Sequence, residues 1–321
     1  MNILRLGTRG SQLALWQART AAALVEQAGG PHCEIVIIKT SGDRLAEAPL
    51  SDIGGKRLFV KEIEDALLRH DVDFAVHSCK DMPAVLPDGL AIGAVLQRED
   101  PRDVLVLPQQ AHGPQAQLAT LDDVLQRLGE SARIGTSSVR RIAELTRLLP
   151  TASFQPIRGN LDTRLRKLDA GGYDALVLAA AGMRRLGFAD RISHALAVDA
   201  CVPAPGQGAI AIELRVDDTE ARVAVARIDD AATARAVEAE RALVATLGGG
   251  CQTPVGAVAL ADADDLDLRA VVVSLDGHRV VRGRDRAPRG EATTLGVRLG
   301  RRLIEQGADA ILEEVRRNQG Q

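Results

Sequence analysis

The sequence predicts an α/β fold made of two similar units, followed by a small α+β domain. The chain has 321 residues, which corresponds to about two or three domains at roughly 150 residues each. Strand and helix signals alternate along the first two thirds of the chain, as they do in sheets covered by helices. The phrase Arg-x-Gly-Thr occurs at 5–8 and again at 133–136, followed each time by serine. This repetition indicates that one strand–turn–helix device is used twice.

The first unit is expected to form a sheet of parallel type, because helices connect its strands. Its predicted elements are strands at 3–6, 34–39 and 73–77 and helices at 12–27 and 59–70. The second unit begins near residue 97 and repeats the alternation. Its predicted elements are strands at 104–107, 133–135, 153–157 and 174–181 and a helix that ends at 149.

Beyond residue 231 the pattern changes to that of a small α+β domain. An Ala-rich helix is expected at 231–247. Strand-like runs at 266–275 and 279–283 meet at Asp276-Gly277, which is a strong hairpin signal. Leucines at helical spacing from Leu295, and a last helical stretch to Arg317, complete the domain.

Composition and charge exclude several classes of function. Aromatic residues are only 2% of the chain, so base stacking on aromatic side chains is nearly excluded. The net charge is −3, whereas a protein that binds duplex nucleic acid usually carries a basic excess. Any basic site must therefore be local, which suits a small anionic ligand and predicts no nucleic-acid partner.

Cysteine usage and hydropathy predict a cytoplasmic protein without a membrane partner. Cys33, Cys79, Cys201 and Cys251 are far apart, with no spacing typical of zinc sites or of a disulfide framework. No histidine has a metal-ligand partner at suitable spacing, so no metal is expected. The first residues lack the apolar core of a signal peptide, and the longest apolar run, 175–183, is too short for a bilayer.

Two predicted helix starts are candidate anion sites, because unpaired N–H groups and the helix dipole attract negative charge there. The first carries Arg9 and Ser11, for which a plain serine N-cap is the alternative. The second carries Arg140 and Arg141 beside Thr136 and Ser138. Two cations in a first turn oppose the dipole, so either a bound anion resolves the conflict or the arginines face solvent.

Other cations follow predicted strands, at the edge of an open α/β sheet where ligands bind. Arg158 and Arg185 have this position, and Arg164 lies close behind Arg158. Guanidinium groups match carboxylates or phosphates bidentately, so these arginines predict a grip on such groups. Ordinary helix-surface charge is the alternative for Arg164.

Two further segments could carry chemistry. Ser78, Lys80 and Asp81 follow a strand, and an aspartate ringed by arginines would be ionised and directed into the site. A surface Lys80–Asp81 pair of little energetic value is the alternative. Cys251 follows three glycines, where a thiol can be a nucleophile or an attachment point; a buried, inert cysteine is the alternative.

In their order along the chain, these segments resemble the porphobilinogen deaminase (hydroxymethylbilane synthase) family. The resemblance covers nearly the whole sequence. It rests on Gly-Thr-Arg-Gly-Ser at 7–11, Leu-Ala-Leu-Trp-Gln-Ala at 13–18, Lys-Thr-Ser-Gly-Asp at 39–43, Phe-Val-Lys-Glu at 59–62, His-Ser-Cys-Lys-Asp-Met-Pro at 77–83, Gly-Thr-Ser-Ser-Val-Arg-Arg at 135–141, Arg-Gly-Asn-Leu-Asp-Thr-Arg at 158–164, Pro-Ala-Pro-Gly-Gln-Gly at 203–208 and Gly-Gly-Cys-Gln-Thr-Pro at 249–254.

The resemblance implies two α/β domains like those of periplasmic binding proteins, and a third domain that carries a covalent cofactor. Domain 1 would comprise 1–98 and 204–226, with a returning strand at 209–214, domain 2 residues 99–203, and domain 3 residues 227–321. A dipyrromethane cofactor would be bound to Cys251 through a thioether. Four porphobilinogen molecules would be joined head to tail with release of ammonia, and hydrolysis would then free hydroxymethylbilane.

The resemblance also implies a role for each candidate residue. Asp81 would be catalytic, because a fixed carboxylate stabilises the cation left when ammonia departs. The growing polypyrrole chain is a polyanion, which accounts for an arginine-rich site in an acidic protein. Cofactor-binding residues would be Cys251, Lys80, Ser78, Arg140, Arg141, Thr136, Ser138, Arg164 and Arg185. Substrate-binding residues would be Arg9, Ser11, Arg158, Lys56, Phe59 and Gln207.

One departure from the family pattern and one competing function remain. Arg57 replaces a glycine usual in the family's lid segment, and altered lid motion or substrate affinity is expected.

The competing function is a non-catalytic, two-lobed protein that binds organic anions. It does not account for Cys251 on a glycine loop in a third domain. A monomer is expected, because no large apolar stripe is left over.

Overall fold

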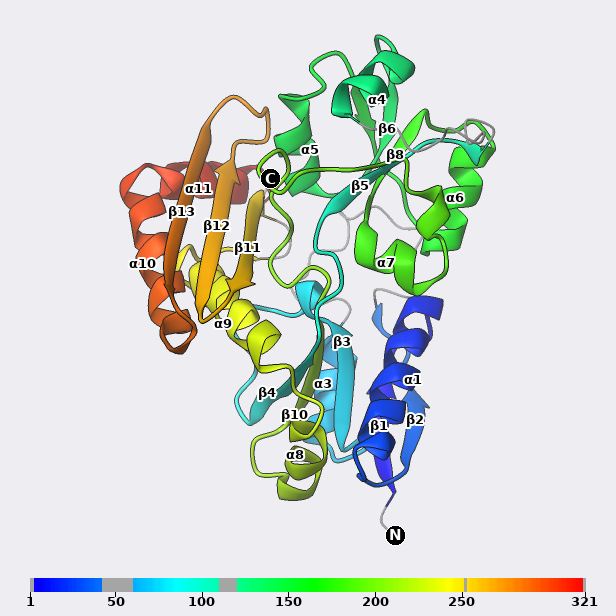
Figure 1. Cartoon of the computed structure of the whole chain (residues 1–321), viewed down its shortest axis with the longest axis vertical. Helices are drawn as coiled ribbons and strands as arrows, with labels where there is room; N and C mark the ends of the chain where they lie inside the picture. Colours follow the sequence, from blue (N-terminus) through cyan, green and yellow to red (C-terminus); the bar gives the residue numbers. More distant parts are fainter. Residues whose placement is uncertain (1–2, 42–59, 110–119, 251–252, 320–321) are drawn as a thin grey trace.

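The computed structural model describes residues 3–41, 60–109, 120–250 and 253–319. Two α/β lobes stand end to end in Figure 1, and a small domain, orange to red, lies against the side of both. Each lobe contains a five-stranded sheet, and the small domain contains a three-stranded sheet. The predicted fold class, two similar α/β domains and a small α+β domain, is confirmed.

The sheet of the first lobe combines strands from two distant parts of the chain. Its order is β2 (Cys33–Ile37), β1 (Leu4–Thr8), β3 (Phe74–Ser78), β10 (Ile210–Arg215) and β4 (Leu90–Leu96). β1 pairs in parallel with β2 and β3, but β10 runs antiparallel to β3 and β4. The expectation of a parallel sheet is therefore wrong in part. β10 begins beside Ser78, at the edge nearest the other lobe, because the chain returns from that lobe.

The second lobe repeats this arrangement. Its order is β7 (Ser153–Gln155), β6 (Arg133–Gly135), β8 (Ala175–Ala179), β5 (Asp103–Val106) and β9 (His194–Ala195). β6 is parallel to β7 and β8, and β5 is antiparallel to β8. β6 thus occupies the place of β1, so the two copies of Arg-x-Gly-Thr lie in equivalent strands.

Helices cover both faces of each sheet, and their first turns are capped as the sequence indicates. Ser11 caps α1 (Gln12–Gln27) by accepting from the Ala14 N–H at 3.3 Å, and Ser138 caps α5 (Val139–Thr146) in the same way. The remaining helices of the lobes are α3 (Lys61–Leu68), α4 (Leu121–Leu128), α6 (Leu161–Asp169), α7 (Ala180–Arg185) and α8 (Thr219–Ala226). A 3₁₀ turn, η2 (Cys79–Asp81), follows β3.

The third domain is a hairpin sheet packed on helices. Its sheet runs β11 (Val255–Asp262), β12 (Asp265–Val273) and β13 (Val280–Pro288), all antiparallel. Its helices are α9 (Ala231–Thr246), α10 (Ala292–Glu305) and α11 (Ala308–Gln319). Gly277 has a φ of 76° in the turn between β12 and β13, so the Asp276-Gly277 hairpin is confirmed.

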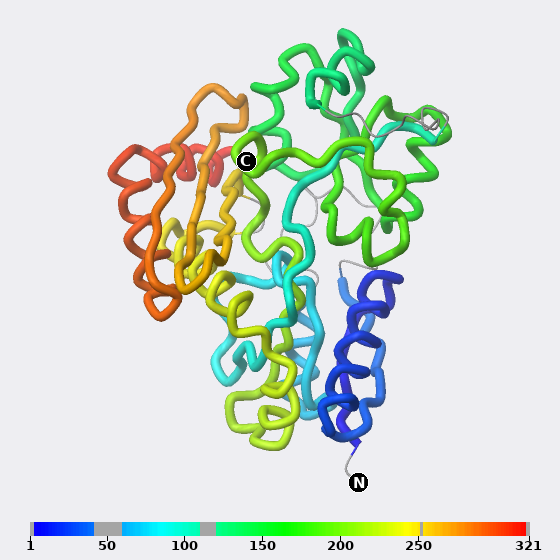
Figure 2. The backbone as a smooth tube through the Cα atoms, in the orientation of Figure 1, coloured from blue at the N-terminus to red at the C-terminus, as the bar shows by residue number. Residues whose placement is uncertain are grey.

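Two segments connect the lobes, and Figure 2 shows the chain crossing between them in both directions. They are residues 97–102 and 203–209, which we call the hinge. The Glu99 N–H donates to the Gly208 carbonyl at 3.1 Å and ties the segments together. A Cβ on Gly208 would lie 2.3 Å from the Glu99 carbonyl oxygen, so only glycine allows this approach.

The strands of each sheet fall within the sequence ranges predicted for the three domains. The bounds 1–98 with 204–226, 99–203 and 227–321 remain our proposal.

Candidate functional site

The ends of β1 and β3 that face the second lobe form a small hollow of about 70 Å³. Its polar lining comes from Arg9 and Ser11 at the start of α1, Gln17 one turn further, and Ser78 and Asp81 after β3. The Gln17 amide donates to the Ser78 hydroxyl at 2.9 Å, which fixes one side of the hollow. Four residues predicted from separate motifs are thus brought together here.

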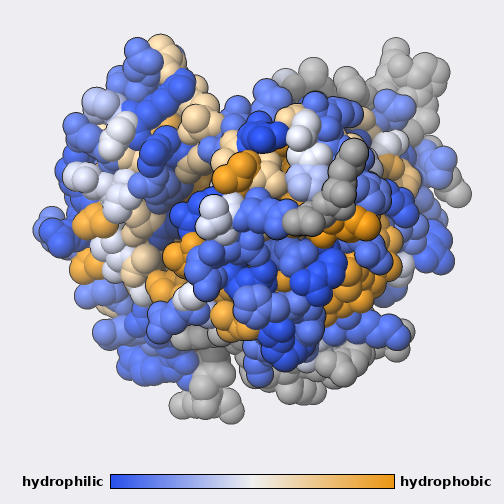
Figure 3. Space-filling model, turned by 90° about the horizontal axis from the view of Figure 1, so that it is seen from below, coloured by the Kyte–Doolittle hydropathy of each residue, from blue (hydrophilic) through white to orange (hydrophobic). Residues whose placement is uncertain are grey.

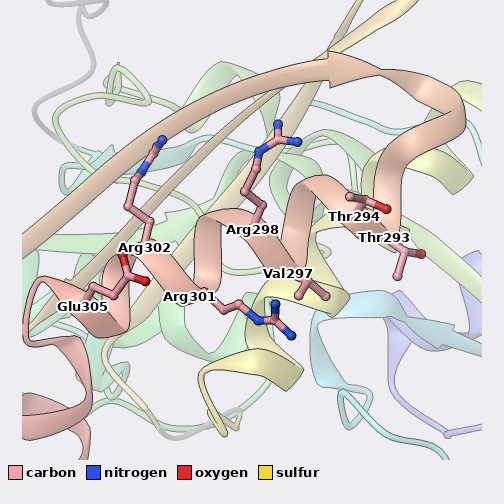
Figure 4. A pocket seen from close by; sticks show the side chains of 7 residues that line it. All are labelled: Thr293, Thr294, Val297, Arg298, Arg301, Arg302 and Glu305. Atoms are coloured by element: carbon pink, nitrogen blue, oxygen red, sulfur yellow. The ribbon is translucent and has the colours of Figure 1, made fainter.

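A larger cavity of about 530 Å³ lies elsewhere, along α10 of the third domain (Figure 4). It is open to solvent, and all the residues that line it belong to α10. Two of its three arginines already face a carboxylate, since Arg298 and Arg302 lie 2.8 and 3.9 Å from Asp285. We therefore place the candidate site at the smaller hollow.

Lys80 and Asp81 lie in η2, which turns the chain into the site directly after β3. The Lys80 ammonium donates to Gln207 Oε1 at 3.4 Å. Burial lowers the pKa of Lys80 to about 8, and the charges of Arg141 and Arg140 act in the same direction. Asp81 opposes them by favouring the charged ammonium.

Arg164 and Arg158 approach from the second lobe. Arg164 lies on α6 and donates to the Gly159 carbonyl at 2.8 Å. Burial lowers the pKa of Arg164 to about 10, with Arg141 and Arg158 adding repulsion, while Asp81 favours its charge. Asp81 thus interacts with a lysine of its own lobe and an arginine of the other.

Arg140 and Arg141 point into the protein, where Asp103 binds both. Asp103 lies 2.7 Å from each guanidinium. Burial alone would raise the pKa of Asp103, but the two arginines hold it well below its usual range. The alternative in which these arginines face solvent is therefore wrong: both are buried, and an internal carboxylate compensates their charge. Contact of these two arginines with a ligand remains a prediction.

The same buried network reaches the hinge. Gln207 is 1% exposed and donates to Asp103 at 2.9 Å and to the Pro101 carbonyl at 2.7 Å. Because its carbonyl oxygen accepts from Lys80, Gln207 connects the hinge to both lobes. Glu144 accepts from the Val202 N–H at 2.8 Å, and burial raises the pKa of Glu144 to about 6 against the pull of Arg140.

Thr136 and Ser138 shape the start of α5. Thr136 accepts from the Ser138 N–H at 3.2 Å, and Ser138 accepts from the Arg141 N–H at 3.4 Å. The N-cap expected as the alternative for Ser11 is present, and Ser138 caps its helix as well. The binding role of each hydroxyl remains a prediction.

Arg185 lies between the lobes, at the end of α7. Its guanidinium donates to the Gly208 carbonyl at 2.7 Å and lies 5.7 Å from the centre of the Trp16 ring. Burial lowers the pKa of Arg185 to about 10, partly opposed by Glu99.

Three predicted site residues, Lys56, Phe59 and Cys251, lie outside the described residues, and so does Arg57. The chain before Cys251 is described up to Gly250. Gly248 has a φ of 61°, and Gly250 forms a turn with Thr253, whose N–H donates to the Gly250 carbonyl at 3.0 Å.

Asp103 and Gln17 belong to the site but were not predicted from the sequence. Asp103 is the first residue of the apolar strand β5, and a charged residue in an otherwise apolar strand could have indicated a buried ion pair. Gln17 lies on the buried face of α1, where a polar side chain among alanines could have indicated a site.

Fold and site together define a two-lobed α/β protein whose lobes bring cations around one carboxylate, Asp81. Residues 4–223 match the family model described as "Porphobilinogen deaminase, dipyromethane cofactor binding domain", and residues 234–305 match "Porphobilinogen deaminase, C-terminal domain". The chain belongs to the porphobilinogen deaminase family. It is accordingly an enzyme of the transferase class.

Curated relatives agree over nearly the full length. Porphobilinogen deaminase of Acidithiobacillus ferrooxidans is 48% identical and that of Syntrophobacter fumaroxidans 45% identical, each with 98% of both chains covered. Among solved structures, an ancestral cationic amino acid solute binding protein gives a TM-score of 0.42 at 13% identity, covering 70% of this chain and 86% of its own. That score is low, and the fold class rests on the sheets described above.

The described residues fit an anionic cofactor such as dipyrromethane. Lys80, Arg164 and Arg185 all have pKa values lowered mainly by burial. The protein's own carboxylates therefore do not fully compensate these three cations. Carboxylate side chains on a bound group would do so, because an opposite charge nearby favours the charged form.

Proposed function

We propose that Asp81 and the cations around it carry out the condensation of four porphobilinogen molecules, followed by hydrolysis to hydroxymethylbilane. The observation that carries this proposal is the position of Asp81, whose charge acts on Lys80 from one lobe and on Arg164 from the other. When bound through Cys251, dipyrromethane supplies the pyrrole carbon to which the first porphobilinogen is joined.

The cations hold the carboxylates. Porphobilinogen carries an acetate and a propionate side chain, so every added unit brings two negative charges. Guanidinium groups bind such carboxylates bidentately, and half-buried ones do so more strongly than exposed ones. We assign substrate carboxylates to Arg9 and Arg158, assisted by Ser11, and cofactor carboxylates to Lys80, Arg164 and Arg185, assisted by Ser78.

Asp81 acts where positive charge develops. Each condensation breaks the carbon–nitrogen bond of a protonated aminomethyl group and a carbon–hydrogen bond of the receiving pyrrole, and forms one carbon–carbon bond; ammonia and a proton leave. The carboxylate oxygens of Asp81 accept the pyrrole N–H and stabilise the cation that remains after ammonia departs. The same oxygens can take up the proton that the receiving pyrrole releases.

Replacement of Asp81 by Asn tests this role. We expect the rate of porphobilinogen consumption to fall by on the order of a hundredfold to ten-thousandfold, the range for loss of a positioned acid–base or electrostatic group. Ammonia release should fall in parallel. Asp88→Asn, at an exposed position before β4, is the control. A fully active Asp81→Asn enzyme would exclude this assignment.

The oligomeric state, location and partners of the enzyme are a further part of the proposal. Among the described helices, none is long and apolar enough to cross a membrane. The face seen in Figure 3 carries many hydrophilic residues, with patches of hydrophobic residues between them. We propose a monomer that acts in the cytoplasm without a membrane partner. The net charge of −3 supports the absence of a nucleic-acid partner.

A further inference from the structure

Trp16 and Arg185 meet where the two lobes come closest. Trp16 lies on α1 of the first lobe and Arg185 at the end of α7 of the second, directly above α1 in Figure 1. The guanidinium carbon is 5.7 Å from the ring centre, within the range of a cation–π interaction. The helices also meet at Gly182, where a Cβ would lie 3.8 Å from the Leu13 side chain.

The guanidinium of Arg185 is fixed from a second direction by the hinge. It donates to the Gly208 carbonyl at 2.7 Å, the same oxygen that accepts from the Glu99 N–H. The Arg185 side chain is half-buried, and it forms no ion pair with a carboxylate of the described residues. Arg185 is therefore held by one carbonyl and one aromatic ring, with hydrogen-bonding capacity left for an anion.

We propose that Trp16 is the positioning residue for Arg185, holding its guanidinium between the lobes so that it can bind a carboxylate of the pyrrole chain. This inference rests on the proposed function of Arg185. It adds a residue that touches no reacting atom and acts through the arginine. Because Trp is the best aromatic partner for a guanidinium, neither Leu nor Phe at this position would hold it equally well.

The contact also gives the protein an internal reporter. Trp16 is the single tryptophan of the chain, so all indole fluorescence comes from this position. A cation held over the ring changes the emission of indole. The spectrum therefore reports whether Arg185 lies against Trp16, whether or not the enzyme turns over.

The first test compares emission spectra of the substrate-free holoenzyme with Arg185→Gln and Arg184→Gln variants. Arg184 is the matched control, because it is the neighbouring arginine but faces Asp100 at 3.2 Å. We expect Arg185→Gln to change the wavelength or intensity of emission, and Arg184→Gln to leave it close to wild type. An unchanged spectrum in Arg185→Gln would overturn the proposal, even if that variant were inactive.

The second test separates positioning from folding. Trp16→Leu should lower kcat/KM for porphobilinogen by on the order of threefold to tenfold, because a loosely held Arg185 no longer fixes the carboxylate of the bound pyrrole chain, and Trp16→Phe should lie between Leu and wild type. Thermal unfolding identifies a variant that has lost its fold, and Trp16→Phe then decides. Wild-type kcat/KM in a folded Trp16→Leu enzyme and in Trp16→Phe would overturn the proposal. A wild-type protein that does not consume porphobilinogen, but still shows the emission difference, would instead contradict the proposed function.

Discussion

The arginines of this site fall into two groups, which differ in the partner that each guanidinium binds. Arg140 and Arg141 share the buried Asp103, so their charge is compensated inside the second lobe. Arg164 donates to a backbone carbonyl, and Arg185 donates to a backbone carbonyl and lies against the Trp16 ring. Burial lowers the pKa of both guanidinium groups. Arg164 and Arg185 can therefore bind an external carboxylate directly. At Arg140 and Arg141 an external carboxylate would have to bind beside Asp103, which already occupies both guanidinium groups.

Lys80 provides a pH test of the anion site. Its pKa of about 8 lies below the usual lysine value, and a bound carboxylate would favour the charged form. Binding therefore takes up a proton above that pKa. In a Cys251→Ser protein, which cannot retain a thioether-linked cofactor, affinity for porphobilinogen should fall by up to about tenfold per pH unit above pH 8.

Lys80→Arg is the control for this prediction, because guanidinium stays protonated throughout that range. Binding measured by calorimetry at several pH values should show a flatter dependence in Lys80→Arg than in its parent. Equal slopes in the two proteins would show that Lys80 does not titrate at the binding site.

At the scale of elements, one ion pair is built into both sheets in the same way. Arg5 at β1 donates its N–H and its guanidinium to Asp73, at 2.7 Å each. Arg133 at β6 does the same to Asp174, at 2.8 Å each. Each aspartate directly precedes the third strand of its lobe, so each pair joins the strands that carry the site residues.

Removal of either carboxylate should loosen only its own lobe. Asp73→Ala leaves a backbone N–H and a guanidinium without their acceptor, at a cost of about 1–3 kcal/mol. Hydrogen exchange should then accelerate in β1 and β3, but not in β6 and β8, and Asp174→Ala should give the reverse. The effect of Asp174→Ala should be smaller, because Asp174 is 38% exposed and Asp73 only 15%. Equal acceleration in both lobes would contradict two separately stabilised sheets.

Local patterns predicted most elements, and the misses have physical causes. α1 and β6 have the predicted bounds: the Ser11 cap marks the start of α1, and β6 belongs to the second copy of Arg-x-Gly-Thr. β4 and β11 were not predicted, because glycine and alanine weaken their strand signals. Glycine is needed in β4 because of close packing: a Cβ on Gly93 would lie 2.5 Å from the Leu214 side chain.

The predicted ends of two strands were wrong, because they depend on where the strands leave the sheet. The apolar run 174–181 was predicted as one strand, but β8 ends at Ala179 and α7 begins at Ala180. Alanine is the best helix former, so the end of this run continues as helix once it leaves the sheet. β13 extends to Pro288, beyond the predicted end at 283, because its alternating arginines belong to an edge strand.

At the scale of the whole molecule, one buried glutamate attaches the hinge to the third domain. Glu240 on α9 accepts from the Arg98 guanidinium at 2.6 and 2.9 Å, from the Gly206 N–H at 2.6 Å and from the Ala259 N–H at 2.7 Å. Arg98 and Gly206 belong to the hinge, and Ala259 to β11. The domain that carries Cys251 is thereby fixed to the segments that connect the lobes.

These long-range contacts could not be predicted from the sequence. The motifs identified the cations and Asp81, because each follows a recognisable strand or helix start. They gave no sign that Asp103 compensates Arg140 and Arg141, or that Gln207 joins Lys80 to that network. Partners so distant along the chain become visible only when the sheets are assembled.

The intact mass of the denatured protein, measured beside a Cys251→Ser variant, decides whether Cys251 carries the covalent pyrrole chain on which the proposed condensation depends. We predict an excess equal to two linked pyrrole units in the wild type and none in the variant. Incubation with porphobilinogen should then add further pyrrole units to the wild type only. A bare polypeptide mass that gains nothing after incubation with porphobilinogen would contradict the account.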